Sequence, residues 1–328
     1  MPSSTFHTPR PAPPGEATTS SWTLELPRGR SLTLHAGAPL VMGVLNLTPD
    51  SFSDGGAWLD PAHPRRPDRA VARALEMVEE GARILDLGAE STRPGGGVYG
   101  GGARTVPPDE ELDRLLPVLE RLRETTDAAL SVDTRKAAVA ERALAAGADL
   151  INDVSALGDP DMAPLLAESG CPVVLMHSRG ELSTMQREIR FSDLLGEVRS
   201  ELAAAVERAE AAGVRRERIL VDPGIGFGKT AEQNLALLGS LPELAALGLP
   251  ILIGASRKSF LGTVTGEPAD RRLPGSLAAA ARAADGGAAI LRVHDVAQTV
   301  GFMRVWHAIE REARREAGGG PGRGEAPR

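Results

Sequence analysis

Polar side chains follow several short apolar runs along this chain, and their types suit ligand binding. Asp133, Asn152 and Asp222 each stand at the end of such a run. Together they offer several acceptors and one amide that can both donate and accept. Because a carboxylate can accept two parallel hydrogen bonds, this set suits a flat heterocycle that carries several ring N–H and amino groups.

A second set of residues at equivalent positions is cationic and suits a different part of a ligand. Its members are Arg93, Lys258, Arg292 and His294. An acid or amide after a strand often serves only as a helix N-cap, but capping needs an acceptor and these groups donate. They suit a phosphate or diphosphate instead. Asn46, with a loop acceptor such as Asp54, suits Mg²⁺, which prefers oxygen ligands and often bridges diphosphate oxygens.

The elements that must position these residues alternate between short β-branched runs and longer segments of helical period, as in repeated β/α units. We predict strands near 41–46, 83–87, 129–132, 150–154, 172–176, 219–222, 250–254 and 290–293. We predict helices near 68–80, 109–124, 136–146, 160–169, 191–212, 230–239, 272–285 and 296–315. Eight strands alternating with eight helices predict a (β/α)8 barrel, in which all the strand-end residues converge on one rim.

A doubly wound sheet shares this alternation and is the alternative architecture. It favours a Gly-rich turn after the first strand, where this chain has Asn46, Thr48 and Asp50. The barrel is therefore preferred. The segment 23–35 alternates like a small β-hairpin with a glycine turn, and we expect it to plug the lower mouth of the barrel.

Composition sets the remaining bounds. The 328 residues carry a formal net charge of −7, which gives no electrostatic case for nucleic acid or an anionic membrane. No run approaches the roughly 18 apolar residues of a membrane span, and the start of the chain lacks the apolar region of a signal peptide. The single cysteine, Cys171, excludes an internal disulfide and suits a reducing cytoplasm. We expect a disordered extension over 1–22, the barrel over 23–317 and a disordered tail over 318–328.

Seven stretches of the sequence resemble, in order, the dihydropteroate synthases of folate biosynthesis. The two longest are residues 43–56 (GVLNLTPDSFSDGG) and 86–95 (DLGAESTRPG), and the others are 131–134, 151–154, 222–229, 256–259 and 292–296. The resemblance covers roughly residues 38–312. It implies that the chain joins p-aminobenzoate to (7,8-dihydropterin-6-yl)methyl diphosphate and releases diphosphate.

The resemblance also implies roles for individual residues. The pterin would be held by Asp133, Asn152, Asp222 and Lys258, between apolar walls formed by Met176 and Phe227. Arg292 would flank the ring and, with His294 and Asn46, bind the diphosphate and its Mg²⁺. Phe52 and Asp54 would lie on the first mobile loop and help form the p-aminobenzoate pocket, and Ser259 follows that pattern too. Thr92 and Arg93 would lie on the second mobile loop.

The family mechanism fits these residue types. Diphosphate departs first and leaves a cation at the exocyclic methylene, which the neutral arylamine then attacks. Lys258, Arg292 and His294 would stabilise the leaving group, while Asp54 would face the developing positive charge. The resemblance further implies a homodimer and competition by sulfonamides, which mimic p-aminobenzoate.

Two other functions remain possible at this stage. A methyltetrahydrofolate corrinoid methyltransferase shares the pterin slot but needs neither the Ser-Phe-Ser-Asp loop nor the Arg/His diphosphate clamp, and this chain has both. A non-catalytic pterin-binding paralogue is the other alternative.

The segment 226–230 imitates the end of a P-loop, but Pro223 stands where a Walker A motif requires glycine. We therefore expect Lys229 to brace the rim rather than to contact phosphate.

Overall fold

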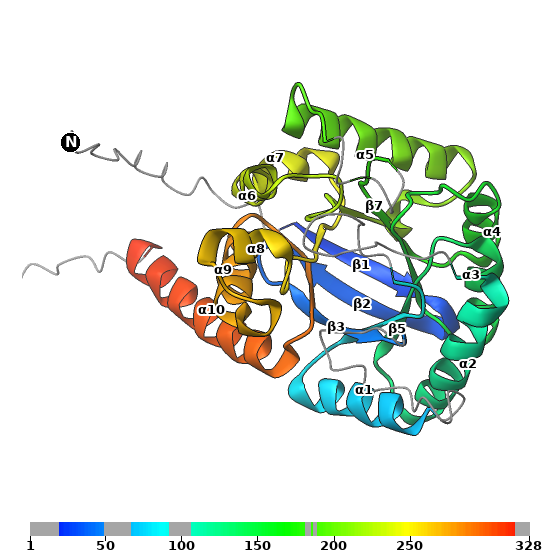
Figure 1. Cartoon of the computed structure of the whole chain (residues 1–328). Helices are drawn as coiled ribbons and strands as arrows, with labels where there is room; N and C mark the ends of the chain where they lie inside the picture. The colour runs from blue at the N-terminus through cyan, green and yellow to red at the C-terminus, as the bar shows by residue number, and fades with distance from the viewer. Residues whose placement is uncertain (1–19, 49–66, 92–105, 181–184, 186–188, 319–328) are drawn as a thin grey trace, which may run out of the picture.

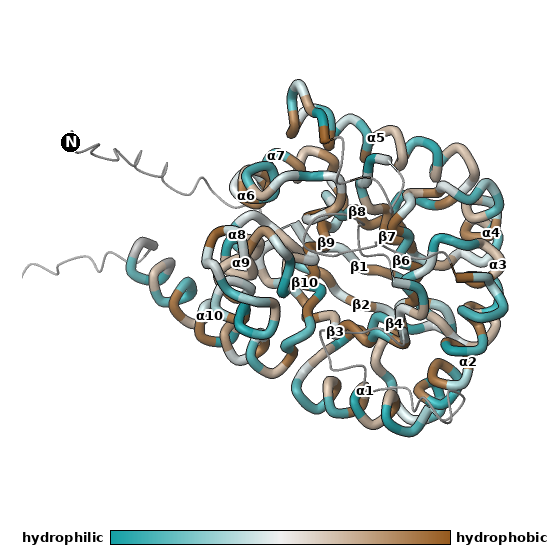
Figure 2. Tube along the Cα trace, in the orientation of Figure 1, coloured by the Kyte–Doolittle hydropathy of each residue, from teal (hydrophilic) through white to brown (hydrophobic). Residues whose placement is uncertain are grey.

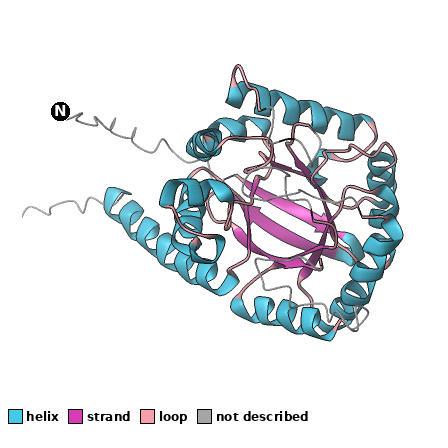
Figure 3. Ribbon diagram, viewed as in Figure 1, coloured by secondary structure: helices cyan, strands magenta, loops and turns pink. Residues whose placement is uncertain are grey.

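A ring of parallel strands surrounded by helices forms the body of the protein (Figures 1 and 3). The structure is a computed structural model that describes residues 20–48, 67–91, 106–180, 185 and 189–318. The eight strands of the ring are β3 (Leu40–Asn46), β4 (Ile84–Gly88), β5 (Ala129–Asp133), β6 (Leu150–Asp153), β7 (Val173–Met176), β8 (Ile219–Asp222), β9 (Leu252–Ile253) and β10 (Ile290–Val293).

The strands pair in the order β8-β7-β6-β5-β4-β3-β10-β9, and every pairing is parallel. A parallel bridge between Val221 and Ile251 joins the two ends of this sheet and closes it. The predicted (β/α)8 barrel is therefore confirmed.

Helices connect successive strands and cover the outside of the ring. They are α1 (Asp68–Glu80), α2 (Pro108–Thr125), α3 (Ala137–Ala145), α4 (Met162–Ser169), α5 (Leu194–Ala211), α6 (Ala231–Gly239), α7 (Leu241–Leu244), α8 (Ser259–Thr265), α9 (Leu273–Asp285) and α10 (Val296–Gly318). In Figure 2 hydrophilic and hydrophobic residues alternate along these helices, as expected for amphipathic segments with one face on the barrel. Within the described ranges, no helix is long and apolar enough to cross a membrane.

Strand residues contribute alternately to two apolar regions, because successive side chains of a strand point to opposite faces. Those that face outward, such as Leu85, Leu87 and Val132, pack beneath the helices in the larger core. Those at the first inward position form a layer inside the barrel, and they are Met42, Ile84, Ala129, Leu150, Val174, Leu220, Leu252 and Ile290.

The N-terminal hairpin closes the lower mouth of the barrel, as predicted. It consists of β1 (Ser21–Leu26), a short 3-10 turn, η1 (Pro27–Gly29), and β2 (Arg30–His35), paired antiparallel. Leu24, Leu26 and Leu34 pack against the inner layer of the barrel.

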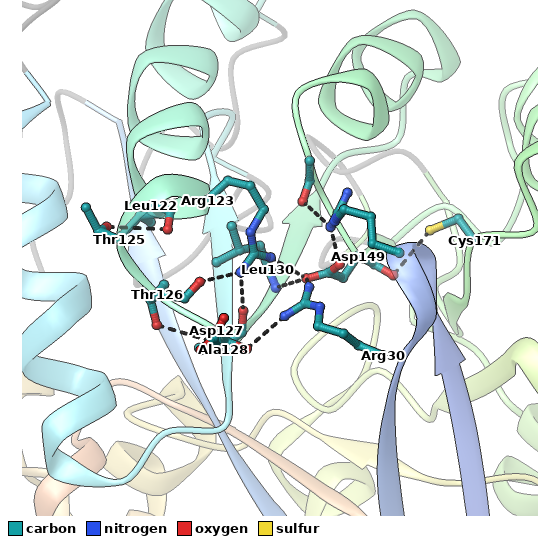
Figure 4. Close-up of polar contacts among 12 residues, drawn as sticks. Arg30, Leu122, Arg123, Thr125, Thr126, Asp127, Ala128, Leu130, Asp149 and Cys171 are labelled. Carbon is teal, nitrogen blue, oxygen red and sulfur yellow. Dashed lines mark hydrogen bonds and ion pairs between the residues drawn. The ribbon is translucent and has the colours of Figure 1, made fainter.

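An ion-pair cluster holds the hairpin in place. The carboxylate of Asp149, fully buried before β6, accepts from Arg28, from Arg30 at 2.5 Å and from Arg123 at 2.9 Å. Figure 4 shows Arg30 and Arg123 converging on it from different elements. This end of the barrel is thus occupied by structural contacts, which leaves the opposite end for a site.

Candidate active site

The strand-end residues predicted from sequence lie in the inner layers of the barrel, directly above the apolar layer. Two residues beyond five of these eight inward positions, toward the carboxyl end of the strand, the same face carries a polar group: Asp86 after Ile84, Ser131 after Ala129, Asn152 after Leu150, Asp222 after Leu220 and Arg292 after Ile290. One further step of the same alternation adds Asp133 on β5 and Asn46 on β3. Asn46, Asp133, Asn152, Asp222 and Arg292 thus lie toward the carboxyl ends of their strands, on the inward face of the barrel.

Arg292 joins two of these acids across the barrel. Its Nε donates to Asp86 Oδ2 at 2.6 Å, and its Nη2 donates to Asp133 Oδ2 at 2.8 Å. Burial by itself lowers the pKa of Arg292, but the carboxylates of Asp86 and Asp133 outweigh burial and raise it. The guanidinium is therefore fixed in position and permanently charged.

Asp86 is a site residue that the sequence analysis missed. It is completely buried, and it also accepts from Ser131 Oγ at 2.6 Å and from Asn152 Nδ2 at 3.3 Å. It therefore orients both Arg292 and Asn152. The available signal was a charged residue at an inward position of an otherwise apolar strand (Ile84–Gly88), where an unpaired acid would be very costly.

One carboxylate oxygen of Asp133 has no hydrogen-bond partner among the described residues. Its Oδ1 is buried, and among the described residues no donor lies within hydrogen-bond distance of it. It is not a helix cap, because the N–H of Ala137 at the start of α3 donates to Asp159 instead. Burial raises the pKa of Asp133 to about 7, with Arg292 opposing this rise and Asp86 adding to it. A buried acceptor left open in this way indicates a ligand that donates.

Asp222 and Lys258 form the other charged part of the site. Burial raises the pKa of Asp222 and lowers that of Lys258 to about 8, while each charge favours the ionised form of the other. The ammonium of Lys258 donates to the carbonyl oxygen of Ile225 and lies 4.6 Å from the centroid of the Phe227 ring. Asp222 Oδ1 accepts from the N–H of Gly224 at 2.7 Å. Asp222 is thus held at the end of β8, and Lys258 is held just before α8, in the segment that follows β9.

Met176 and Phe227, predicted as apolar walls, belong to one small apolar cluster with Val154 and Met185. Met176 ends β7 directly opposite Asp222 on β8. The cluster therefore gives the polar mouth one apolar side, as a flat, partly aromatic ligand requires.

Asn46 ends β3, and His294 directly follows the adjacent strand, β10. Gly43 of β3 is paired with Val293 of β10. Asn46 and His294 both come after this pair, so they lie on neighbouring parts of the barrel rim. The His294 ring nitrogen Nδ1 lies 3.1 Å from Ser256 Oγ, and the His294 N–H donates to the same oxygen at 3.2 Å. Ser259 is the first residue of α8 and directly follows Lys258.

Within the described ranges, no group of three or more His, Cys, Asp or Glu residues could hold a metal ion. The oxygen that the predicted metal residue offers is the amide oxygen of half-buried Asn46. Mg²⁺ commonly takes one or two protein ligands and completes its shell with water and substrate phosphates. The residues present therefore fit a magnesium ion that arrives with a diphosphate, not one held by a protein cage.

Four predicted site residues lie outside the described residues. They are Phe52, Asp54, Thr92 and Arg93. Their assignments to the two loops remain predictions.

The raised pKa of Asp133 predicts a pH-dependent cost to stability. Between its ordinary pKa of about 4 and the folded value of about 7, the folded protein keeps a proton that the unfolded chain releases. Stability from this group is therefore lost as pH rises through that window. The difference in Tm between Asp133→Asn and the wild type should shift in favour of the variant by roughly 5 °C between pH 4 and pH 8. Thermal unfolding across this pH range checks the result; a Tm difference independent of pH would contradict it.

Comparison with known proteins identifies the family to which the chain is similar. Residues 42–294 match the family model described as pterin binding enzyme. The dihydropteroate synthase of Synechocystis sp. is 45% identical, over 87% of this chain and 95% of the relative. Among solved structures, the Yersinia pestis dihydropteroate synthase with a sulfonamide drug complex superposes with a TM-score of 0.80 at 42% identity, covering 88% of this chain and 99% of that one. The Xanthomonas albilineans dihydropteroate synthase with 4-aminobenzoic acid gives 0.78 at 46% identity, covering 89% and 99%.

Proposed function

Because the chain belongs to the dihydropteroate synthase family of pterin-binding enzymes, we propose that it condenses p-aminobenzoate with (7,8-dihydropterin-6-yl)methyl diphosphate. The products are 7,8-dihydropteroate and diphosphate, so the chain is a transferase of folate biosynthesis. The observation that carries this assignment is the open, buried oxygen of Asp133, which shares the barrel mouth with Asn152 and Asp222.

The pterin ring is proposed to bind edge-on to these three residues. Its ring N–H and amino groups donate to the carboxylates of Asp133 and Asp222, and the amide of Asn152 pairs with a neighbouring edge position. Lys258, still mostly protonated at pH 7 with a pKa of about 8, supplies a donor to the ring. Met176 and Phe227 bound the slot with apolar surface.

The diphosphate is proposed to bind on the other side of Arg292. The guanidinium, fixed by Asp86 and Asp133, and the ring of His294 face the leaving group as charge develops on it. Asn46 would hold Mg²⁺, which when bound neutralises negative charge on the diphosphate oxygens.

After diphosphate leaves, the neutral arylamine is proposed to attack the exocyclic methylene without a strong base, and the acidic anilinium ion so formed releases its extra proton to water. Asp54 would stabilise the positive charge that develops there. Phe52, Asp54 and Ser259 are proposed to help form the p-aminobenzoate pocket, with Thr92 and Arg93 on the second substrate-binding loop, and sulfonamides should compete for this pocket.

Purified protein incubated with the pterin diphosphate, p-aminobenzoate and Mg²⁺ tests the proposal. We expect stoichiometric release of diphosphate and formation of dihydropteroate, both inhibited by a sulfonamide in competition with p-aminobenzoate. Pterin binding without diphosphate release would instead identify a non-catalytic paralogue.

We place this activity in the cytoplasm, because the chain has one cysteine and that residue, Cys171, is buried and unpaired. Separation of cell fractions followed by detection of the protein tests this location.

A homodimer is proposed through the outer helices. Val305 and Ile309 on α10 are 62% and 58% exposed, and their i,i+4 spacing puts them on one face of that helix. Replacing Val305 by aspartate should convert a dimer to a monomer, because a charge at the centre of an apolar contact must be desolvated. Analytical ultracentrifugation measures the change, and an unaltered dimer would place the interface elsewhere.

A further inference from the structure

We infer that Lys229 is a positioning residue of the pterin site, whose buried ammonium fixes segment 223–228 and through it Lys258 and Phe227. The inference rests on the proposed function, since it assumes that Lys258 and Phe227 contact the pterin. Lys229 itself lies behind these residues and is assigned no contact with substrate.

The ammonium of Lys229 joins two strand ends. Lys229 is only 3% exposed. Its Nζ donates to the carbonyl oxygens of Gly224 and Phe227, each at 3.0 Å, and lies 2.9 Å from His177 Nδ1 at the end of β7. The three donors of the ammonium are therefore spent on the segment after β8 and on the residue after β7.

Burial of the Lys229 ammonium costs folding free energy, which its hydrogen bonds must offset. Within the described part of the chain, no carboxylate oxygen lies within ion-pair distance of the Lys229 ammonium. Burial lowers its pKa to about 7, although the more distant charge of Asp222 opposes this fall and that of Lys258 adds to it. An apolar side chain would avoid this cost, but it would leave the converging carbonyl oxygens of the segment without donors. The contacts of Lys229 therefore specify the conformation of the segment.

The segment in turn sets the position of Lys258. The carbonyl oxygen of Ile225 accepts from the Lys258 ammonium, and the Phe227 ring lies 4.6 Å from it. A Cβ on Gly226 would stand 2.9 Å from Lys258 Cδ. Any shift of the segment therefore moves or releases the Lys258 ammonium.

Lys229 also contacts the ring of His177, and a further contact holds that ring in place. Burial, assisted by the charge of Lys229, lowers the pKa of His177 to about 4, so the ring is neutral at pH 7. Its Nε2 lies 3.1 Å from Glu201 on α5, and Glu201 also pairs with Arg179. The neutral ring therefore donates from Nε2 to Glu201 and presents Nδ1 as the acceptor for Lys229.

The fit between the segment and β7 is close at one point. Gly224 has a φ of +68°, and a Cβ there would lie 1.9 Å from the carbonyl oxygen of His177. The segment can therefore move only away from β7, and the Lys229 ammonium is the group that holds the two together.

Steady-state kinetics of two variants of the full chain test the inference. Lys229→Met keeps the length of the side chain and removes its donors. Thr230→Val is the matched control: it destroys the capping box that begins α6 with Gln233 and leaves the ammonium in place. The KM for the pterin diphosphate, the KM for p-aminobenzoate and kcat are measured together with Tm.

For Lys229→Met we expect the KM for the pterin diphosphate to rise at least tenfold, with kcat and the KM for p-aminobenzoate each changed less than threefold. Thr230→Val should lower Tm without changing the pterin KM more than twofold. If the methionine variant does not fold, Lys229→Gln, which retains one donor group, should give a smaller rise of the same selectivity. An unchanged pterin KM, a loss confined to kcat, or an equal rise in Thr230→Val would overturn the inference. Inactive wild-type protein would contradict the proposed function instead.

Discussion

Replacing Asp222 by asparagine should lower kcat/KM for the pterin diphosphate roughly 100- to 1,000-fold, because two charge-assisted hydrogen bonds to the ring are worth about 3–5 kcal/mol. Asparagine keeps the shape of the side chain but offers one acceptor oxygen where the carboxylate offers two. It also removes the charge that favours protonation of Lys258. The loss should therefore appear mainly as weaker pterin binding, measured by isothermal titration calorimetry.

The matched control is Asp149→Asn, the same substitution of a buried acid at the opposite end of the barrel. Asp149 accepts from the arginines that hold the hairpin in place, so this variant should lose stability and keep its affinity for pterin. Wild-type pterin affinity in Asp222→Asn would remove Asp222 from the binding site.

Replacing Arg292 by methionine should lower kcat roughly 100- to 1,000-fold, the usual cost of removing one donor from a site where negative charge develops. The same change leaves Asp86 and Asp133 without their shared partner. Breaking a buried pair typically costs about 3–5 kcal/mol, so Tm should fall too. Single-turnover measurement of diphosphate release separates the chemical step from binding.

Arg292→Lys distinguishes charge from geometry at this position. Lysine keeps the positive charge, but its single ammonium cannot reproduce the planar fork that joins Asp86 to Asp133. We expect it to restore most of the lost stability and little of the lost kcat. Full recovery of kcat by lysine would show that charge alone suffices and would contradict the assigned geometry.

The barrel could be predicted from sequence because the residues of its inner apolar layer and of its outer core recur in local patterns along the strands and helices. Each of the eight strand segments is short and mostly apolar, and the observed strands and helices that were predicted differ from the predicted ranges by at most three residues at either end. Helix α8 (Ser259–Thr265) was missed, because seven residues that include Gly262 and two β-branched threonines carry little helical signal. The short α7 (Leu241–Leu244) was missed for the same reason of length.

Candidate site residues could be chosen from sequence where a polar residue stands at or just after the end of a strand, as with Asp133, Asp222 and His294. Asp86 was missed because it lies within a strand, and only the closed barrel brings it to Arg292, 206 positions away. The support of the site is also non-local: Lys229 was expected to brace the rim, but its link to His177 depends on the pairing of β7 with β8. Which distant segments pair cannot be predicted from the sequence of either segment alone.

A crystal structure of the protein with bound (7,8-dihydropterin-6-yl)methyl diphosphate, without p-aminobenzoate, tests the central claim most directly. The account predicts the ring edge against Asp133 Oδ1, Asn152 and Asp222, and the diphosphate against Arg292 and His294. A pterin bound with these acids left facing solvent, or with its diphosphate away from Arg292, would contradict it.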